Sequence, residues 1–320
     1  MLKNNHKSNK LLVIVGPTAS GKSDLAIKIA KLFNGEVVSA DSRQVYKGMD
    51  IGTGKVPKDQ DLKTNSRFQI PNSRFYYSEG IRHHLLDVAD PKKDNFSVVQ
   101  YQKLALKAIK DIQKRGKLPI LCGGTGLYIS SVIEGWIFPK GKPNLKLRKK
   151  LEKESAEKLF KKLQKLDPER AKTIDPFNKR RLIRALEILI ENKKIPPLKK
   201  KPLKMKILIL GIKKDKEELK KLIKKRLEKR LKEGMIKEVE KLKKEGVSSS
   251  RLESFGLEYR FINRYLENKI SFKELKEQLF KAICQYAKRQ MTWFRNKIKN
   301  IIWIENLKQA IKLTGEFISN

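Results

Sequence analysis

The stretch GPTASGKS at residues 16–23 constrains the fold of this chain more than any other. The apolar run KLLVIVG (10–16) precedes it, and SDLAIKIAKLF (23–33), with apolar residues at helical spacing, follows it. A strand, a glycine loop and a helix in this order form a cradle in which backbone N–H groups wrap a phosphate. Gly16, Gly21, Lys22 and Ser23 meet the required spacing, with Lys22 for the terminal phosphate and Ser23 for Mg²⁺. The loop predicts phosphate binding, but a kinase, an ATPase and an enzyme that releases pyrophosphate would all use it.

Apolar runs alternate with helical patterns through the first part of the chain. GEVVSAD (35–41) and KLPILCGG (117–124) are expected strands, IRHHLLDV (81–88) is an expected strand at a sheet edge, and residues 96–116 form a helix closed by Gly116. This alternation favours an α/β fold, a P-loop NTPase-like parallel sheet flanked by helices.

The pattern changes after Trp136. Residues 137–197 have helical periodicity with several prolines, which predicts a small all-helical insertion domain between core segments 1–136 and 198–320. In the second core segment, MKILILGIK (205–213) returns to strand. Helices are then expected over about 215–245, 257–268 and 272–298, with a last edge strand at 301–305.

The charge balance is strongly basic, with 75 Lys and Arg against 35 Asp and Glu. Residues 140–204 hold 23 of the basic and eight of the acidic side chains, an excess of 15 within a net charge of +40. Such an excess favours a polyanionic partner, although lysine-rich composition alone would also produce many of these solvated helix faces. No run of eighteen apolar residues occurs, and the two cysteines have no metal-ligand spacing. We therefore expect a cytoplasmic protein that does not bind a membrane.

Asp41 and Thr125 each follow an expected strand. In an open parallel sheet the carboxyl ends of the strands face the ligand crevice, so both side chains are predicted to reach it. A carboxylate there would hold Mg²⁺ or take a proton from an acceptor substrate. The alternatives are that Asp41 caps the turn that follows it and that GGT (123–125) is a plain turn.

Together the motifs resemble the tRNA dimethylallyltransferase (isopentenyl-tRNA transferase) family over about residues 10 to 295. They are GPTASGKS, DSRQVYKGMDIGTGK, HHLLDV, ILCGGTGLYI, RRLIRALEI and AKRQMTWFR. The resemblance implies transfer of a dimethylallyl group from dimethylallyl diphosphate to the exocyclic amine of the adenine 3′ to the anticodon in tRNAs. The glycine loop would then hold the diphosphate of a leaving group.

The resemblance also implies roles for individual residues. Those matched to the diphosphate are Gly16, Pro17, Thr18, Ala19, Ser20, Gly21, Lys22 and Ser23, with Ser23 on Mg²⁺. Asp41, Thr18 and Arg226 are matched to catalysis, Asp41 as the acceptor of the amine proton and Arg226 on the diphosphate. Those matched or assigned to tRNA are Asp41, Ser42, Arg43, Gln44, Thr125, Arg180, Arg181, Leu182, Ile183, Arg184, Lys288, Arg289 and Arg295. The anticodon stem-loop is the expected partner, and a monomer is the expected state.

Three other functions stay open at this point. A small-molecule P-loop kinase would explain the loop and Asp41, but it would leave the basic insert and KRQMTWFR without a role. An adenylate isopentenyltransferase would prenylate free nucleotide and would not need the insert. A non-catalytic RNA-binding protein would not need Lys22, Ser23 and Asp41. Trp293 and Phe294 would either stack a splayed base or pack in the core of an amphipathic helix.

Overall fold

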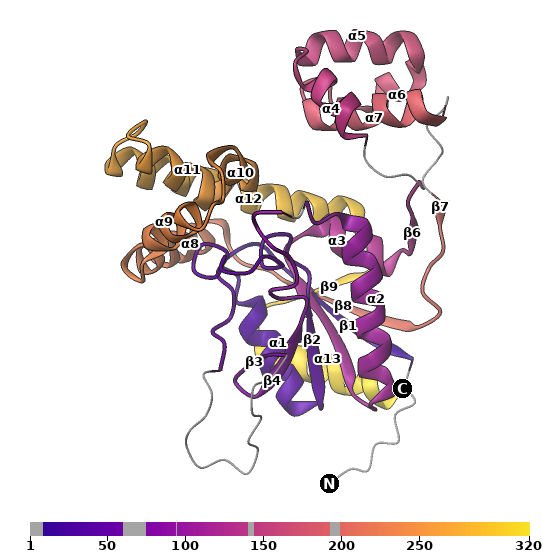
Figure 1. The fold of residues 1–320 in the computed structure, drawn as a ribbon. Coiled ribbons are helices and arrows are strands. Elements are labelled where there is room, and N and C mark those ends of the chain that lie inside the picture. The colour runs from indigo at the N-terminus through magenta and orange to yellow at the C-terminus, as the bar shows by residue number, and fades with distance from the viewer. Residues whose placement is uncertain (1–8, 60–74, 94, 140–143, 193–198) are drawn as a thin grey trace. The chain divides into compact units, whose positions relative to one another are not determined.

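The computed structural model describes residues 9–59, 75–93, 95–139, 144–192 and 199–320 (Figure 1). The chain divides into two compact units. One comprises residues 1–135 and 202–320 and contains the central sheet, and the other comprises residues 136–201.

The first unit is built on a seven-stranded sheet in which every neighbouring pair is parallel except β3 and β4. In spatial order its strands are β3 (Tyr76–Ser78), β4 (Ile81–His84), β2 (Gly35–Ser39), β5 (Leu118–Gly123), β1 (Lys10–Val15), β8 (Lys206–Ile212) and β9 (Ile301–Ile304). The predicted parallel α/β sheet is confirmed. The strand expected at the edge over 81–88 covers only Ile81–His84 and lies inside the sheet, because the short β3 pairs with its outer side.

Alternate residues of the central strand β1 enter separate cores on the two faces of the sheet. Leu11, Val13 and Val15 pack with α2 (Val98–Lys114), α3 (Gly126–Ile133) and Phe294 of α12 (Phe272–Lys297). Leu12 and Ile14 pack with α1 (Lys22–Leu32) and α13 (Leu307–Ser319). Helices therefore cover both faces, which is the layering of a doubly wound α/β fold (Figure 1).

A third core joins five helices to the segment that follows β2. The helices are α8 (Lys216–Lys232), α9 (Met235–Lys244), α10 (Ser249–Phe255), α11 (Leu257–Leu266) and α12. Val45, Tyr46 and Met49 are buried among them. The single helix expected over about 215–245 is wrong, because Gly234 adopts φ +99° between α8 and α9 and turns the chain.

The second unit contains four helices among its described residues. They are α4 (Leu145–Glu152), α5 (Ala156–Leu166), α6 (Pro168–Thr173) and α7 (Lys179–Asn192). They share a small core that includes Leu159, Leu163, Leu182 and Leu186. The short strands β6 (Trp136–Ile137) and β7 (Lys199–Lys200) pair as an antiparallel ribbon, which was not expected from the sequence.

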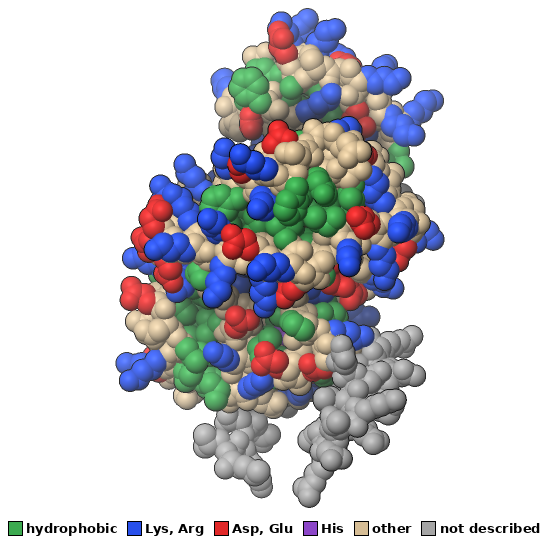
Figure 2. Space-filling view, turned by 90° about the vertical axis from the view of Figure 1, so that its left-hand side faces the viewer, with side chains coloured by type: hydrophobic (Ala, Val, Ile, Leu, Met, Phe, Trp, Pro, Cys, Tyr) green, Lys and Arg blue, Asp and Glu red, His purple; other side chains and the backbone are tan. Residues whose placement is uncertain are grey.

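Basic side chains outnumber acidic ones in the chain, with 75 Lys and Arg against 35 Asp and Glu. On the face seen in Figure 2, Lys and Arg side chains are distributed widely, with Asp and Glu among them. None of the helices among the described residues has the length and apolar character needed to cross a membrane.

Candidate functional site

The glycine loop lies between the end of β1 and the start of α1. Gly21 precedes α1 with φ +83°, and Ala19 also lies in the left-handed region at φ +61°. This alternation of backbone conformations turns successive N–H groups inward and makes an anion-binding concavity at the positive end of a helix. The Ser20 hydroxyl is buried and has no hydrogen-bond partner among the described residues, which fits a polar ligand at this position.

Lys22 is the first residue of α1, and its ammonium group donates a hydrogen bond to the Pro17 carbonyl at 3.1 Å. Burial, with smaller contributions from the positive charges of Arg226 and Arg230, lowers the pKa of Lys22 to about 8. The negative charge of Asp41 acts in the opposite direction. These interactions bring Lys22, both arginines and Asp41 into one electrostatic cluster.

The two turns at the carboxyl ends of β2 and β5 are joined by hydrogen bonds. The Thr125 N–H donates to the Ala40 carbonyl, and the Thr125 hydroxyl accepts from the Ser42 N–H, both at 3.0 Å. Asp41 Oδ1 accepts from the N–H groups of Arg43 at 2.8 Å and Gln44 at 3.3 Å. Asp41 therefore caps its own turn through Oδ1 alone, and no hydrogen bond to Oδ2 is seen among the described residues.

Gln290 connects the glycine loop to the turn after β5. Its Oε1 accepts from the Thr18 N–H at 2.8 Å, and its Nε2 donates to the Gly124 carbonyl at 2.9 Å. Gln290 was not among the residues predicted from the sequence, whereas its exposed neighbours Lys288 and Arg289 were. A signal was present, since Gln290 is the polar residue in the buried stripe of α12.

Two arginines of α8 lie against Gly54. Arg226 donates to the Gly54 carbonyl at 3.4 Å, and Arg230 donates to the Gly52 carbonyl at 3.2 Å. Gly54 has φ +61°, and a Cβ there would collide with both guanidinium groups. Burial, and then the charge of Arg230, lowers the pKa of Arg226 to about 10. Arg230 Nη2 is buried without a partner among the described residues. Two adjacent guanidinium groups in such a place favour an anionic ligand.

Gln44 and Arg43, which follow Asp41 in the sequence, contact residues around the same site. Gln44 donates to the carbonyls of Thr53 and Gly54, and its Oε1 accepts from Ser39. Arg43 lies over the Phe255 ring, with 5.5 Å to its centroid. The structure therefore brings the loop, the Asp41 segment, Thr125 and Arg226 together within one unit.

Glu258 and Tyr286 join this cluster and were not identified from the sequence. Burial raises the pKa of the Glu258 carboxyl, although Arg230, at 3.4 Å, opposes that shift. Burial also raises the pKa of the Tyr286 hydroxyl, and the charge of Asp41 adds to this effect. Both side chains come from helices distant in sequence, so no local motif marks them.

In the second unit, the predicted tRNA-binding segment Arg180–Arg184 combines arginines with two buried apolar side chains. Arg180 and Arg181 are exposed, and Arg184 pairs with the buried Glu187 at 2.5 Å. Leu182 and Ile183 are buried in the unit's own core, so their side chains cannot contact a ligand on the surface. Side-chain contacts from Arg180–Arg184 to RNA would therefore come from its arginines.

The last predicted residues lie on α12. Lys288, Arg289 and Arg295 are exposed, as phosphate contacts require. Phe294 is fully buried, and the Trp293 indole packs against Gly126 and donates to the Ser130 hydroxyl at 3.3 Å. Core packing is therefore observed for Phe294, whereas Trp293 is half-buried at the edge of the same core and its stacking on a base stays a prediction.

The donor set suits Mg²⁺ bound together with phosphate oxygens. Among the described residues, no three His, Cys, Asp or Glu side chains gather as a metal site. Ser23 lies in the first turn of α1 and offers a hydroxyl. Mg²⁺ commonly takes only one or two protein ligands and completes its shell with phosphate oxygens and water. The residues present fit that arrangement.

Comparisons with known proteins agree on one family. A family model described as IPP transferase matches residues 44–297. A tRNA dimethylallyltransferase from Acetivibrio thermocellus is 43% identical, with 97% of this chain and 100% of the relative covered. One from Syntrophus aciditrophicus is 42% identical, with 94% and 97% covered.

Solved structures give the same result. The tRNA isopentenylpyrophosphate transferase of Bacillus halodurans is 34% identical with a TM-score of 0.67, covering 98% of this chain and 96% of its own. A eukaryotic dimethylallyltransferase acting on tRNA is 28% identical with a TM-score of 0.78, covering 98% and 80%. With near-complete coverage of both the sequence and the fold, the chain belongs to the IPP transferase family, the family of the tRNA dimethylallyltransferases.

Proposed function

We propose that this protein transfers a dimethylallyl group from dimethylallyl diphosphate to the exocyclic amine of the adenine 3′ to the anticodon in tRNAs, releasing diphosphate. The observation that carries the proposal is the electrostatic cluster of Lys22, Arg226 and Arg230 with Asp41, in which both arginines lie against Gly54. Three cations in one cluster would stabilise a departing diphosphate, and the nearby carboxylate could accept a proton.

The bonds broken and formed in this transfer balance without a further reactant. The allylic C–O bond of the donor breaks, and both electrons leave with the diphosphate. The lone pair of the adenine amine forms the new C–N bond, and the amine then loses one proton. Lys22, Arg226 and the loop N–H groups stabilise the charge that develops on the leaving group, while Asp41 Oδ2 accepts the proton.

The same residues hold the reactants in place. Ala19, Ser20 and Gly21 supply the concave backbone for the diphosphate, and the Thr18 N–H is held by Gln290. Ser42, Arg43, Gln44 and Thr125 surround Asp41 and would orient the adenine. Mg²⁺, held by Ser23 and the phosphate oxygens, would supply further positive charge for the leaving group.

The RNA must present an adenine that has left its stack. Extrusion of a base costs a few kcal/mol, which contacts to the RNA backbone must offset. Exposed basic side chains are available for these contacts, Lys288, Arg289 and Arg295 on α12 and Arg180 and Arg181 on α7. The proposal assigns every role to one chain, and a monomer is the state that we propose.

The test is incubation of the protein with labelled dimethylallyl diphosphate, Mg²⁺ and an unmodified anticodon stem-loop. The expected product is RNA whose mass has increased by one dimethylallyl group in place of one hydrogen, with the label on the adenine 3′ to the anticodon. A parallel reaction uses a stem-loop with guanine at that position and should give no product. Unchanged RNA in the first reaction would contradict the proposal.

A further inference from the structure

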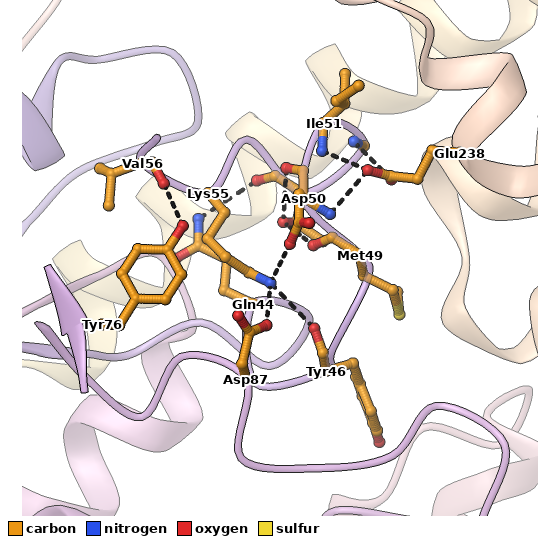
Figure 3. A network of polar contacts seen from close by, with 12 residues as sticks. Gln44, Tyr46, Met49, Asp50, Ile51, Lys55, Val56, Tyr76, Asp87 and Glu238 are labelled. Carbon is orange, nitrogen blue, oxygen red and sulfur yellow. Dashed lines mark hydrogen bonds and ion pairs between the residues drawn. The ribbon is translucent and has the colours of Figure 1, made fainter. Parts of the chain in front are cut away.

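Lys55 is a buried lysine that lies outside the substrate-contacting set described above. Its side chain is 0% exposed, and its ammonium group contacts Asp50 Oδ1 and Asp87 Oδ1, each at 2.5 Å. The same nitrogen donates to the Tyr46 carbonyl at 3.1 Å. A buried ammonium group is costly unless it is fully compensated, and here two carboxylates and a carbonyl satisfy its three donors (Figure 3).

These contacts close the segment from Tyr46 to Lys55 into a ring. The Lys55 N–H donates to the Asp50 carbonyl at 3.0 Å, and the Gly54 N–H donates to the Ile51 carbonyl at 3.0 Å. Asp87 lies in the segment after β4, so the ammonium group also ties the ring to the sheet. The ring would lose its central attachment if the positive charge were removed.

Glu238 of α9 holds the opposite side of the ring. Its Oε2 accepts from the N–H groups of Asp50 and Ile51 at 2.9 and 2.6 Å, and its Oε1 accepts from the Gly52 N–H at 3.1 Å. The Tyr259 hydroxyl donates to Oε1 at 2.8 Å. Figure 3 shows Glu238 and Lys55 approaching the ring from different directions. One carboxylate thus orients three consecutive backbone N–H groups.

The ring presents its carbonyl groups to the cationic side of the site. The Gly52 carbonyl accepts from Arg230, and the Gly54 carbonyl accepts from Arg226 and, at 3.2 Å, from Gln44. Since both guanidinium groups lie against Gly54, a displacement of this backbone moves both arginines.

We propose that Lys55 and Glu238 are positioning residues that fix the Gly52–Gly54 carbonyls, and through them place Arg226 and Arg230 against the diphosphate. This inference rests on the proposed function for its link to turnover. Its effect on anion binding can be measured without any prenyl transfer.

The experiment compares Lys55→Met, Glu238→Gln and the control Lys31→Met. Met keeps most of the lysine volume and removes the charge, and Gln keeps the shape of Glu but places an amide against backbone donors. Lys31 forms an exposed pair with Glu79 at 2.7 Å in the same unit. Lys31→Met therefore makes the same chemical change as Lys55→Met at a position outside the ring. For each protein we would measure Kd for inorganic pyrophosphate, Kd for the RNA stem-loop, and kcat and KM for transfer.

The proposal expects Lys55→Met and Glu238→Gln to weaken pyrophosphate binding about tenfold and to lower kcat on the order of 10²-fold, because small displacements of catalytic groups have effects of that size. RNA affinity and the control variant should stay within about twofold of the wild type. A purely structural role would lower only the folded fraction, which changes the apparent kcat and leaves both Kd values unchanged.

Unchanged pyrophosphate affinity in the folded variants would overturn the inference. If Lys55→Met does not fold, the pyrophosphate affinity of Glu238→Gln decides whether the inference holds. This variant leaves the buried Lys55 ammonium group paired with its two carboxylates. A wild-type protein that binds pyrophosphate but transfers no prenyl group would contradict the proposed function and leave the pyrophosphate comparison valid. Failure of the wild type to bind pyrophosphate would overturn both.

Discussion

Thr18 and Gln290 are separated by 272 positions in sequence, yet the backbone N–H of Thr18 donates to Gln290 Oε1 at 2.8 Å. The other end of the same amide donates to the Gly124 carbonyl. One side chain of α12 therefore fixes the spacing between the glycine loop and the turn that carries Thr125.

Gln290→Met tests this bridge. The substitution leaves a backbone N–H and a buried carbonyl without their partner, which should lower the free energy of unfolding by about 1–3 kcal/mol. Pyrophosphate binding should weaken as well, because the loop loses a fixed anchor. Chemical denaturation and calorimetric titration measure the two effects. Gln285→Met on the exposed side of the same helix is the matched control, and equal effects of the two variants would contradict the prediction.

Asp41→Asn tests the proton acceptor. Asn retains Oδ1, so the bonds from the N–H groups of Arg43 and Gln44 can persist and RNA binding should be retained. Turnover should fall by at least about 10²-fold, since a neutral amide cannot accept the amine proton. Single-turnover transfer measures the rate, and Asp24→Asn in the exposed first turn of α1 controls for charge. Near-normal transfer by Asp41→Asn would remove this residue from the chemistry.

The lowered pKa of Lys22 predicts a pH dependence of anion binding. The ammonium form attracts the diphosphate, and in the empty site it is lost as pH rises through about 8. Pyrophosphate affinity of the wild type should therefore fall between about pH 7 and 9 more steeply than that of Lys22→Met. Comparing the two proteins removes the contribution from ionisation of the ligand itself. Parallel pH profiles would show that Lys22 does not titrate in this window.

The pattern around the glycine loop was sufficient to predict the core of the fold. Strand, loop and helix at residues 10–32 and the strands β2, β5, β8 and β9 lie close to their expected bounds, because each combines a clear apolar period with glycine or polar ends. The predicted positions of Asp41 and Thr125 near the loop followed from the rule that parallel strands end at one edge.

Other features depend on contacts that no local pattern encodes. The break at Gly234 lies within a continuous run of charged helical residues, and α13 was missed. Lys55 and Glu238 resemble ordinary surface residues in sequence, and only their shared backbone ring shows their role. Long-range hydrogen bonds of this kind become visible once the helices are placed against the sheet.

Glu187 is a buried carboxylate that should control the stability of the helical unit. It pairs with Arg148 at 2.8 Å and with Arg184. Burial would raise its pKa, but hydrogen bonds from Arg148, Arg184 and the Asn144 N–H outweigh burial and lower the pKa to about 2. Because the folded-state pKa is lowered, this contribution is present above the ordinary carboxyl pKa and is lost as pH falls from about 4.5 toward 2.

Glu187→Gln should therefore destabilise the unit by about 3–5 kcal/mol at neutral pH, since two arginines lose their buried partner. Hydrogen exchange of the α5 and α7 amides measures this loss within the full chain. Glu157→Gln removes an exposed pair with Lys161 on α5 and should leave the exchange nearly unchanged. Equal protection in both variants would contradict a structural role for the buried carboxylate.

Arg180 and Arg181 are exposed at the start of α7, and their joint replacement by Ala tests whether the helical unit grips RNA phosphates. If each arginine neutralises one phosphate, the slope of log affinity against log salt concentration should become shallower by about 1.5, with little dependence on the RNA sequence. Fluorescence anisotropy with the anticodon stem-loop over a range of salt concentrations measures the slope. The control replaces Lys161 and Lys172, two exposed lysines of the same unit that pair with glutamates. An equal change of slope in the control would show that only the total charge of the unit matters. An unchanged slope in the arginine variant would place the RNA contacts elsewhere.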